Sequence, residues 1–192
     1  MTVFRNTLFF ALSTSVTACA SSAPPSLYVL DLPAPTRASG APDAAIGLFE
    51  VSLPAYARNP QITTMTDGAT LFEDDDHRWA NPPAEAISAA LARSLEDSFD
   101  KPVVLKPYPR GLTPELQLSI AFDHFYRTPS GSAEFGGQFI IIEDDEITDI
   151  ERFNITATPS NDSYRGYMQS VSAGLERLVD IIESKIEEPP LG

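Results

Sequence analysis

The stretch ELQLSIAFDHFYRT, residues 115–128, carries the clearest strand pattern in the chain. Large apolar side chains alternate along it with smaller or polar ones, Leu116, Leu118, Ile120 and Phe122 against Gln117, Ser119, Ala121 and Asp123. Because successive side chains of a strand point to opposite faces, this alternation predicts a half-buried strand with one face on a hydrophobic core. A sheet with one covered face is therefore expected.

Further strands are expected on both sides of this stretch. Downstream, a turn at 129–134 precedes β-rich residues 135–147 and 149–159, with the acidic residues 143–146 at a hairpin tip. The pair Gly136-Gly137 indicates a bulge or a close backbone approach. Upstream, we expect strands at residues 27–32, 46–54 and 101–107. In the second of these, the two faces are expected to carry Ile46, Leu48, Glu50 and Ser52 against Phe49, Val51 and Leu53.

A hairpin is expected around Asp67-Gly68. The residues on either side, 61–66 and 69–74, are β-prone. An Asp-Gly pair in this setting favours a tight turn in which both central residues have positive φ.

Two amphipathic helices complete the pattern. Residues 82–99 place Ile87, Ala90, Leu91, Ser94, Leu95 and Phe99 on one face, with Asn81 as a plausible N-cap and a proline at the first helical position. A second helix of about 24 residues follows a cap at Asn161, Asp162 or Ser163. This order predicts a single α+β domain over residues 27–188, a mostly antiparallel sheet with the two main helices on one face.

The amino-terminal segment resembles a bacterial lipoprotein signal. Residues 7–16, TLFFALSTSV, are mostly apolar and uncharged, too few to span a bilayer but long enough for a secretory signal core. Val16-Thr17-Ala18-Cys19 resembles a lipobox, in which the cysteine is acylated and becomes the new amino terminus. The other interpretation is an ordinary signal peptide with Cys19 near its cleavage site by chance. We expect a signal peptide at 1–18 and a lipidated tether at 19–26.

Acylation would make Cys19 a membrane anchor. One acyl chain, such as palmitate, binds a membrane only marginally. Two or three acyl chains hold a protein there without a spanning helix. Ala20 stands where an aspartate favours inner-membrane retention in enteric bacteria, so the resemblance suggests the periplasmic face of the outer membrane. The short tether has a root-mean-square reach of about 15 Å. Apart from these covalent acyl chains, no cofactor is expected.

The composition excludes several kinds of partner. Cleavage after residue 18 removes only Arg5 among the charged residues and changes the net charge from −14 to −15. Such acidity argues against nucleic acid and against polybasic docking on anionic lipid. Cys19 is the only cysteine, so a disulfide within the chain is excluded.

No pattern of catalytic residues stands out. The chain has no Gly-x-Ser-x-Gly motif and no phosphate-binding glycine loop. His77 follows the acidic run 73–76, which lacks metal-site spacing and is better interpreted as a solvated turn between strand and helix. His124 is expected to be a surface or interface residue. These observations predict a protein that is not an enzyme and holds no metal.

Two segments resemble the ABC-type transport auxiliary lipoproteins, the PqiC-like group. They are VSLPAYARNPQITT (51–64) and HRWANPPAEAISAALARSL (77–95). The family pattern is a strand ending in Leu-Pro, then Tyr, Arg, a hairpin, and Arg-Trp-Ala-x-Pro before a helix. The matching residues here are Leu53, Pro54, Tyr56, Arg58, Arg78, Trp79, Ala80 and Pro82. Asn81 and Pro83 depart from the glutamate and leucine that are common in the family. The resemblance covers Leu27 to Ile186.

This resemblance implies a non-catalytic accessory or docking component of an MCE-type intermembrane lipid transport system. The implied partners are an MCE-domain protein and its membrane permease, and a homo-oligomer is also compatible with the family. A lipid-binding shuttle or receiver and a structural envelope-complex lipoprotein are the alternatives.

The candidate partner-binding residues are Pro54, Tyr56 and Arg58, followed by Arg78 and Trp79. Aromatic residues and arginine are common at interface hot spots, and the first three lie on a connection after a strand. For Arg78 and Trp79 we favour a structural role over a partner contact. Trp79 would be buried at the start of the first helix, with Arg78 as its polar neighbour or as the partner of a carboxylate.

Overall fold

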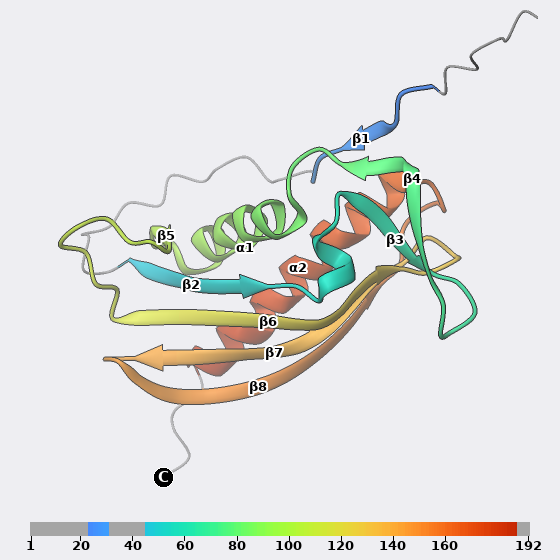
Figure 1. Ribbon diagram of the computed structural model, residues 1–192. Helices are drawn as coiled ribbons and strands as arrows, with labels where there is room; N and C mark the ends of the chain where they lie inside the picture. Colours follow the sequence, from blue (N-terminus) through green and yellow to red (C-terminus); the bar gives the residue numbers. More distant parts are fainter. Residues whose placement is uncertain (1–22, 31–44, 188–192) are drawn as a thin grey trace, which may run out of the picture.

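Strand β6 (Leu116–Arg127) lies in the middle of a mixed eight-stranded sheet in the computed structural model, which describes residues 23–30 and 45–187 (Figure 1). On one side β6 pairs with β2 and, at its end, with β3; on the other side it pairs with β7. The remaining elements have these bounds: β1 Ser26–Tyr28, β2 Ile46–Ser52, the 3-10 helix η2 Ala55–Arg58, β3 Gln61–Met65, β4 Leu71–Trp79, α1 Pro83–Phe99, β5 Val103–Leu105, β7 Ala133–Glu143, β8 Glu146–Ala157 and α2 Tyr164–Glu187.

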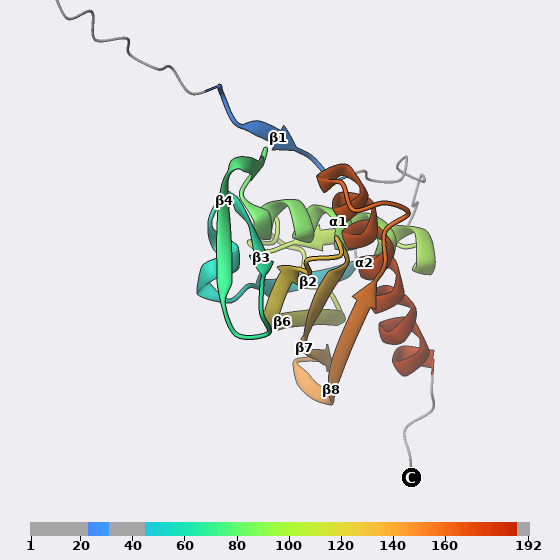
Figure 2. The same cartoon turned by 90° about the vertical axis from the view of Figure 1, so that its right-hand side faces the viewer.

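Both long helices cover the same face of the sheet (Figure 2). The long β6–β7 and β7–β8 pairs and the β3–β4 hairpin are antiparallel. The short strands β1 and β5 and the crossover strand β2 add parallel pairs. The predicted α+β domain, with a mostly antiparallel sheet and two helices on one face, is confirmed. None of the helices in the described residues is long and apolar enough to cross a membrane.

The layer between sheet and helices is filled by apolar side chains. Ile120, Phe135, Phe139 and Leu175 are among the fully buried ones. Phe122 meets Phe125 edge to face with ring centroids 5.6 Å apart, and Phe125 stacks on Phe135 at 5.2 Å. Protein interiors packed in this way are about as dense as organic crystals.

A β-bulge explains why both Phe122 and Phe125 reach this core. Phe122 pairs with Gly137 and His124 pairs with Gly136, so Asp123 is an extra residue on β6. Strict alternation would send residue 125 to the opposite face from residue 122. The extra residue reverses the alternation and keeps both rings on the helix side.

A second bulge, in β2, makes the predicted faces of that strand wrong. Leu48 pairs with Leu118 and Glu50 with Ser119, so Phe49 is the extra residue. Leu48 and Leu53 are therefore both buried, although alternation had placed them on opposite faces. The bulge could not be predicted, because the residues around it are ordinary strand residues.

The two hairpin turns have different geometries, and the one at Asp67-Gly68 differs from the prediction. Among residues 66–70, only Gly68 has positive φ (81°), while the Asp67 carboxylate accepts a hydrogen bond from the Thr70 amide at 3.1 Å. Asp144 and Asp145 have φ values of 51° and 65° between β7 and β8, the pattern of a type I′ turn. The hairpin and the tip at 143–146 are both confirmed; the positive φ expected at Asp67 is wrong.

Two boundaries also differ from the prediction. Residues 73–77 are not a turn but part of β4, because His77 and Trp79 pair with β1 and hold the chain extended. Asn81 is not the N-cap of α1; Pro82 occupies that position without a side-chain hydrogen bond, and Pro83 begins the helix. At α2, Ser163 Oγ accepts the Gly166 amide at 3.0 Å, which confirms a cap within residues 161–163.

Gly137 provides a direct test of the strand alignment. A Cβ atom at this position would lie 1.9 Å from the Ala121 carbonyl oxygen, so the two central strands would have to separate. We expect Gly137→Ala to lower the free energy of unfolding in urea by at least about 3 kcal/mol. Gln138→Ala, the matched control one residue along, should cost less than about 1 kcal/mol. Equal stability of the two variants would contradict the alignment of β6 and β7.

Candidate functional site

The sequence candidates Pro54, Tyr56 and Arg58 belong to the connection between β2 and β3. Pro54 is half-buried and precedes η2, and its carbonyl accepts the Ala57 amide at 3.0 Å. Its fixed φ of −59° suits the entry to a helical turn. The connection is therefore a short ordered turn on the sheet rather than a free loop.

Tyr56 points from η2 toward the bulge in β6. Its hydroxyl oxygen accepts the Phe125 amide at 3.1 Å. On this side of β6 the pairing with β2 ends at Ala121 and β3 pairs only at Arg127, so Tyr56 supplies a partner for a backbone donor in the gap between them. Burial raises the pKa of the half-buried Tyr56 hydroxyl above its ordinary value. Its observed role is to fasten the turn to the central strand.

Arg58 is the most accessible of the three. Its Nε donates to the Leu53 carbonyl at 2.8 Å, which closes the turn, and the residue is otherwise exposed. None of the ion pairs within the described residues involves Arg58. Its guanidinium therefore retains free donors for a carboxylate or a phosphate of another molecule.

Arg78 and Trp79 adopt the structural roles considered for them. The Trp79 side chain is only 6% exposed and packs near Phe125 with ring centroids 6.3 Å apart. Arg78 donates to the carbonyl and the carboxylate of Asp75, at 3.0 and 3.2 Å. For Trp79 the structure supports the buried interpretation.

Polar side chains connect η2 and β3 to the acidic strand β4. Asn59 donates to the Glu73 carboxylate at 3.0 Å, and Gln61 donates to the Asp75 carboxylate at 3.2 Å. Together with Pro54, Tyr56, Arg58 and Arg78 these residues form what we call the η2 surface. It presents one unpaired arginine beside several carboxylates, an arrangement suited to polar protein contacts. Cys19, the lipidation candidate, lies outside the described residues.

The structure also shows a cluster that the sequence did not reveal, which we call the β1 junction. It contains Tyr28, Asp74, His77, Arg127 and Tyr164. The Tyr28 hydroxyl and His77 Nδ1 are 2.8 Å apart, and the His77 ring stacks on Tyr164 at 3.8 Å between centroids. The Ala80 amide donates to the Tyr28 carbonyl at 2.7 Å. These contacts fasten β1, the first described strand after residue 19, to β4 and α2.

Charged groups complete the β1 junction. The Tyr164 hydroxyl donates to the Asp74 carboxylate, and burial together with this carboxylate raises the pKa of Tyr164 to about 12. The buried Arg127 lies over the Tyr164 ring at 4.8 Å and donates to the Asp162 carbonyl at 2.5 Å. The phenol therefore stays neutral and keeps its hydrogen bond throughout the physiological pH range. Sequence reasoning missed the cluster because its members are far apart in the chain.

His124 lies on the sheet face away from the helices. Its Nδ1 is 2.6 Å from Asp123 Oδ1, and Arg152 Nη2 is 2.9 Å from the other carboxylate oxygen. The hydrogen bond from His124, and then that from Arg152, hold the pKa of Asp123 below its ordinary value. Within residues 23–30 and 45–187, no three His, Cys, Asp or Glu side chains are grouped as a metal site would require.

The chain matches one protein-family model over residues 28–183, described as the ABC-type transport auxiliary lipoprotein component. No curated protein sequence matches it. One similar crystal structure, of an uncharacterized protein, has a TM-score of 0.71 at 16% identity and covers 86% of this chain and 100% of its own.

A second crystal structure, of a Xanthomonas campestris protein of the DUF330 family, has a TM-score of 0.62 at 15% identity and covers 82% of this chain and 92% of its own. The PelC dodecamer from Paraburkholderia phytofirmans is less similar, with a TM-score of 0.44 at 13% identity, covering 73% of this chain and 89% of its own. At these identities the structural similarity shows the fold alone.

His77→Ala tests whether the β1 junction holds the first strand. The substitution removes one hydrogen bond and one aromatic stack, together worth about 1.4 to 2.8 kcal/mol. Hydrogen exchange of the Ala80 amide should accelerate about tenfold to hundredfold while global stability changes less. His124→Ala, at the other histidine, is the control and should leave this amide unchanged. Unchanged exchange in His77→Ala would show that β1 is held by other contacts.

Proposed function

The chain belongs to the ABC-type transport auxiliary lipoprotein family, and from this membership we propose that it is a non-catalytic docking component of an MCE-type intermembrane lipid transport system. The family makes it an accessory component of an ABC-type transport system. The observation that carries the proposal is the match over residues 28–183, which spans the strands from β2 to β8 and α2 as far as Glu183.

We further propose that Cys19 is acylated and that the acyl chains hold the protein on the periplasmic face of the outer membrane. The lipobox-like Val16 to Cys19 and Ala20 support this placement. With β1 starting at Ser26, only a short tether separates the anchor from the β1 junction. The domain would stay close to the membrane and would meet a transporter that extends toward it.

The η2 surface is the proposed contact with the MCE-type protein. Arg58 is exposed and forms no ion pair within the described residues, so it is available to a partner carboxylate. Arg78 is half-exposed and already holds Asp75, so it would contribute less. Trp79 would support this surface from the core rather than contact the partner.

The packed core favours docking over lipid carriage. A shuttle or receiver needs an apolar cavity for acyl chains, whereas Phe122, Phe125, Phe135 and Phe139 fill the layer between sheet and helices. The grooves on the described surface that border β1, such as the one of about 320 Å³ lined by Leu27, Val29, Arg165 and Met168, are open and partly polar. The other alternative, a structural lipoprotein of an envelope complex, would have a stable partner that is not a transporter.

Purification of the full lipidated protein from native membranes in mild detergent tests the proposal. We expect an MCE-domain protein and its permease to co-purify. Arg58→Glu should lower their recovery at least about fivefold, because the reversed charge would face a partner carboxylate. Arg165→Glu changes another exposed arginine, outside the η2 surface; it is the matched control and should not change recovery.

Two outcomes would contradict the proposal. Recovery of a stable envelope complex without a transporter would favour the structural alternative. Stoichiometric phospholipid without a protein partner would favour the shuttle. Equal loss of the transporter in both arginine variants would remove the η2 surface as the contact while leaving the transport role intact.

A further inference from the structure

Strand β1 and the two residues after it present two apolar side chains to solvent. Leu27 and Val29 are 65% and 66% exposed, the two highest values among the large apolar side chains of the described residues. Their neighbours point inward, since Tyr28 belongs to the β1 junction and Leu30 is buried. Because side chains alternate along an extended chain, Leu27 and Val29 share the outer side. We call this pair the β1 ridge.

The β1 ridge is held in place by the domain. Ser26 and Tyr28 pair with His77 and Trp79 of β4, and the Ala80 amide donates to the Tyr28 carbonyl at 2.7 Å. Among the described strands β1 pairs only with β4, so its other edge is open. Proteins usually protect such an edge, and an ordered strand with uncovered aliphatic side chains is therefore a candidate interaction surface.

Two open grooves extend this surface onto both helices. One groove, of about 320 Å³, borders α2 and is lined by Leu27, Val29 and Met168, among others. The other, of about 340 Å³, borders α1, and its lining includes Val29, Ala86 and Ala89. Figures 1 and 2 both show β1 at the border of the domain. The apolar surface is thus wider than two isolated side chains.

The length of chain before β1 argues for a lipid bilayer as the occupant of this surface. This step rests on the proposed function, in which Cys19 is acylated. Cys19 and Leu27 are eight positions apart in the sequence, so their Cα atoms lie at most about 28 Å apart. Acyl chains on Cys19 place its backbone at the membrane surface. The β1 ridge is then the first ordered apolar surface of the domain that the bilayer can meet.

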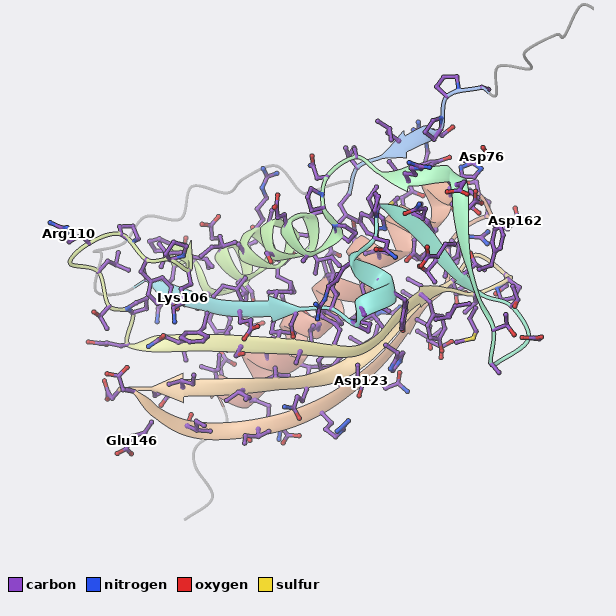
Figure 3. The ribbon with its side chains drawn as sticks, in the orientation of Figure 1. Asp76, Lys106, Arg110, Asp123, Glu146 and Asp162 are labelled. Atoms are coloured by element: carbon purple, nitrogen blue, oxygen red, sulfur yellow. The ribbon has the colours of Figure 1, made fainter. Side chains whose placement is uncertain are left out.

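The charges near β1 do not favour electrostatic binding to anionic lipid. Arg165 lines one of the two grooves and Glu85 lines the other, so these two charges balance. Figure 3 shows Asp76 at the end of the domain where β1 lies, and Lys106 and Arg110 at the opposite end. Attraction to anionic lipid needs clustered Lys and Arg side chains. A contact between β1 and lipid is therefore apolar.

We propose that the β1 ridge and its groove walls lie in the surface of the bilayer that holds the acyl chains, and that this second contact fixes the orientation of the domain. Leu27 and Val29 enter the boundary between headgroups and acyl chains, where apolar side chains of peripheral proteins bind. The acyl chains alone limit only the distance of the domain from the membrane. With the ridge in contact, the end that carries Lys106 and Arg110 points away from the bilayer.

Site-specific labelling of the acylated full chain tests this contact. Leu27→Cys and Val29→Cys each introduce one free thiol, because acylation occupies the thiol of Cys19, the only cysteine. Each variant is labelled with the fluorophore NBD and inserted from outside into vesicles of phosphatidylethanolamine and phosphatidylglycerol, with or without doxyl-labelled phosphatidylcholine. Ile150→Cys, at another exposed apolar position, is the matched control.

The labels should report different surroundings. Iodide in the water should quench the labels at residues 27 and 29 at least about threefold less than the label at residue 150, because the bilayer shields them. Doxyl lipid should quench the labels at residues 27 and 29 only. Raising the phosphatidylglycerol content should not strengthen this quenching, since the contact is apolar.

A second set of variants tests orientation without a label on the ridge. Gln169→Cys places the label at an exposed position that lines the α2 groove. Adding Leu27→Ser and Val29→Ser should weaken doxyl-lipid quenching of this label at least about threefold, because the apolar contact is lost while the anchor remains. Ile147→Ser with Ile150→Ser, which also removes two exposed apolar side chains, is the matched control and should leave the quenching unchanged.

Three results would overturn the inference. One is iodide quenching at residues 27 and 29 as strong as at residue 150. Another is doxyl quenching at residue 169 that is absent from the parent chain or unaffected by the serine substitutions at residues 27 and 29. The third is a label on the ridge that neither iodide nor lipid reaches, which would show that protein covers β1.

Failure of the proposed function gives a different result. A chain that is not acylated does not insert into the vesicles at all. If only the inference is wrong, the chain is acylated and bound to the vesicles, but the labels on the ridge stay exposed to iodide.

Discussion

The rest of the structure depends on one constraint: strand β6 must keep its apolar side chains facing the helices along its whole length. It pairs with β2 and β3 on one side and β7 on the other. If its apolar side chains turned to the solvent face, the core that these three strands share would lose its central part. The bulge at Asp123 meets this constraint, because it returns Phe125 to the helix side. The Phe125 amide lies in the gap between the end of the β2 pairing at Ala121 and the β3 pair at Arg127, and there it donates to Tyr56. The family-like turn after β2 in this way completes the hydrogen bonding of the central strand.

Because the interior is apolar, the polar and charged side chains that could bind a partner lie at the borders of the domain. Aromatic rings fill the layer between sheet and helices, and the polar clusters that the structure describes lie on its borders. The β1 junction fastens the first described strand, and the η2 surface presents Arg58. A protein built in this way is suited to hold its position and to make contacts. That is the behaviour expected of an accessory component of a transport system.

Most helices and strands were predicted from the sequence because side-chain periodicity and turn residues determine them locally. The alternation along 115–128, the hairpin tip at 143–146 and the two amphipathic helices needed only side-chain periodicity and turn chemistry. The bulge at Phe49 was not predictable, since nothing there marks an extra residue. The bulge at Asp123 lies opposite Gly136-Gly137, the pair that indicated a bulge or a close backbone approach. The β1 junction was not predictable either: His77 follows an acidic run that suggests a turn, and only its pairing with Ser26 of β1, distant in sequence, makes it part of a strand. For Trp79, its position just before the first helix favoured a core residue, and the side chain is buried. A surface that binds a partner cannot be found in this way, because it depends on a second molecule.

The central claim is that this domain works from a lipid anchor at Cys19, and the intact mass of the mature chain from native membranes tests it most directly. The account predicts a chain that begins at Cys19 and carries two or three acyl chains, with loss of membrane association in Cys19→Ser. An unmodified chain cleaved at another position and recovered free in the periplasm would contradict it. The domain would then have no fixed distance from a membrane, and the placement of the η2 surface opposite a transporter would lose its basis.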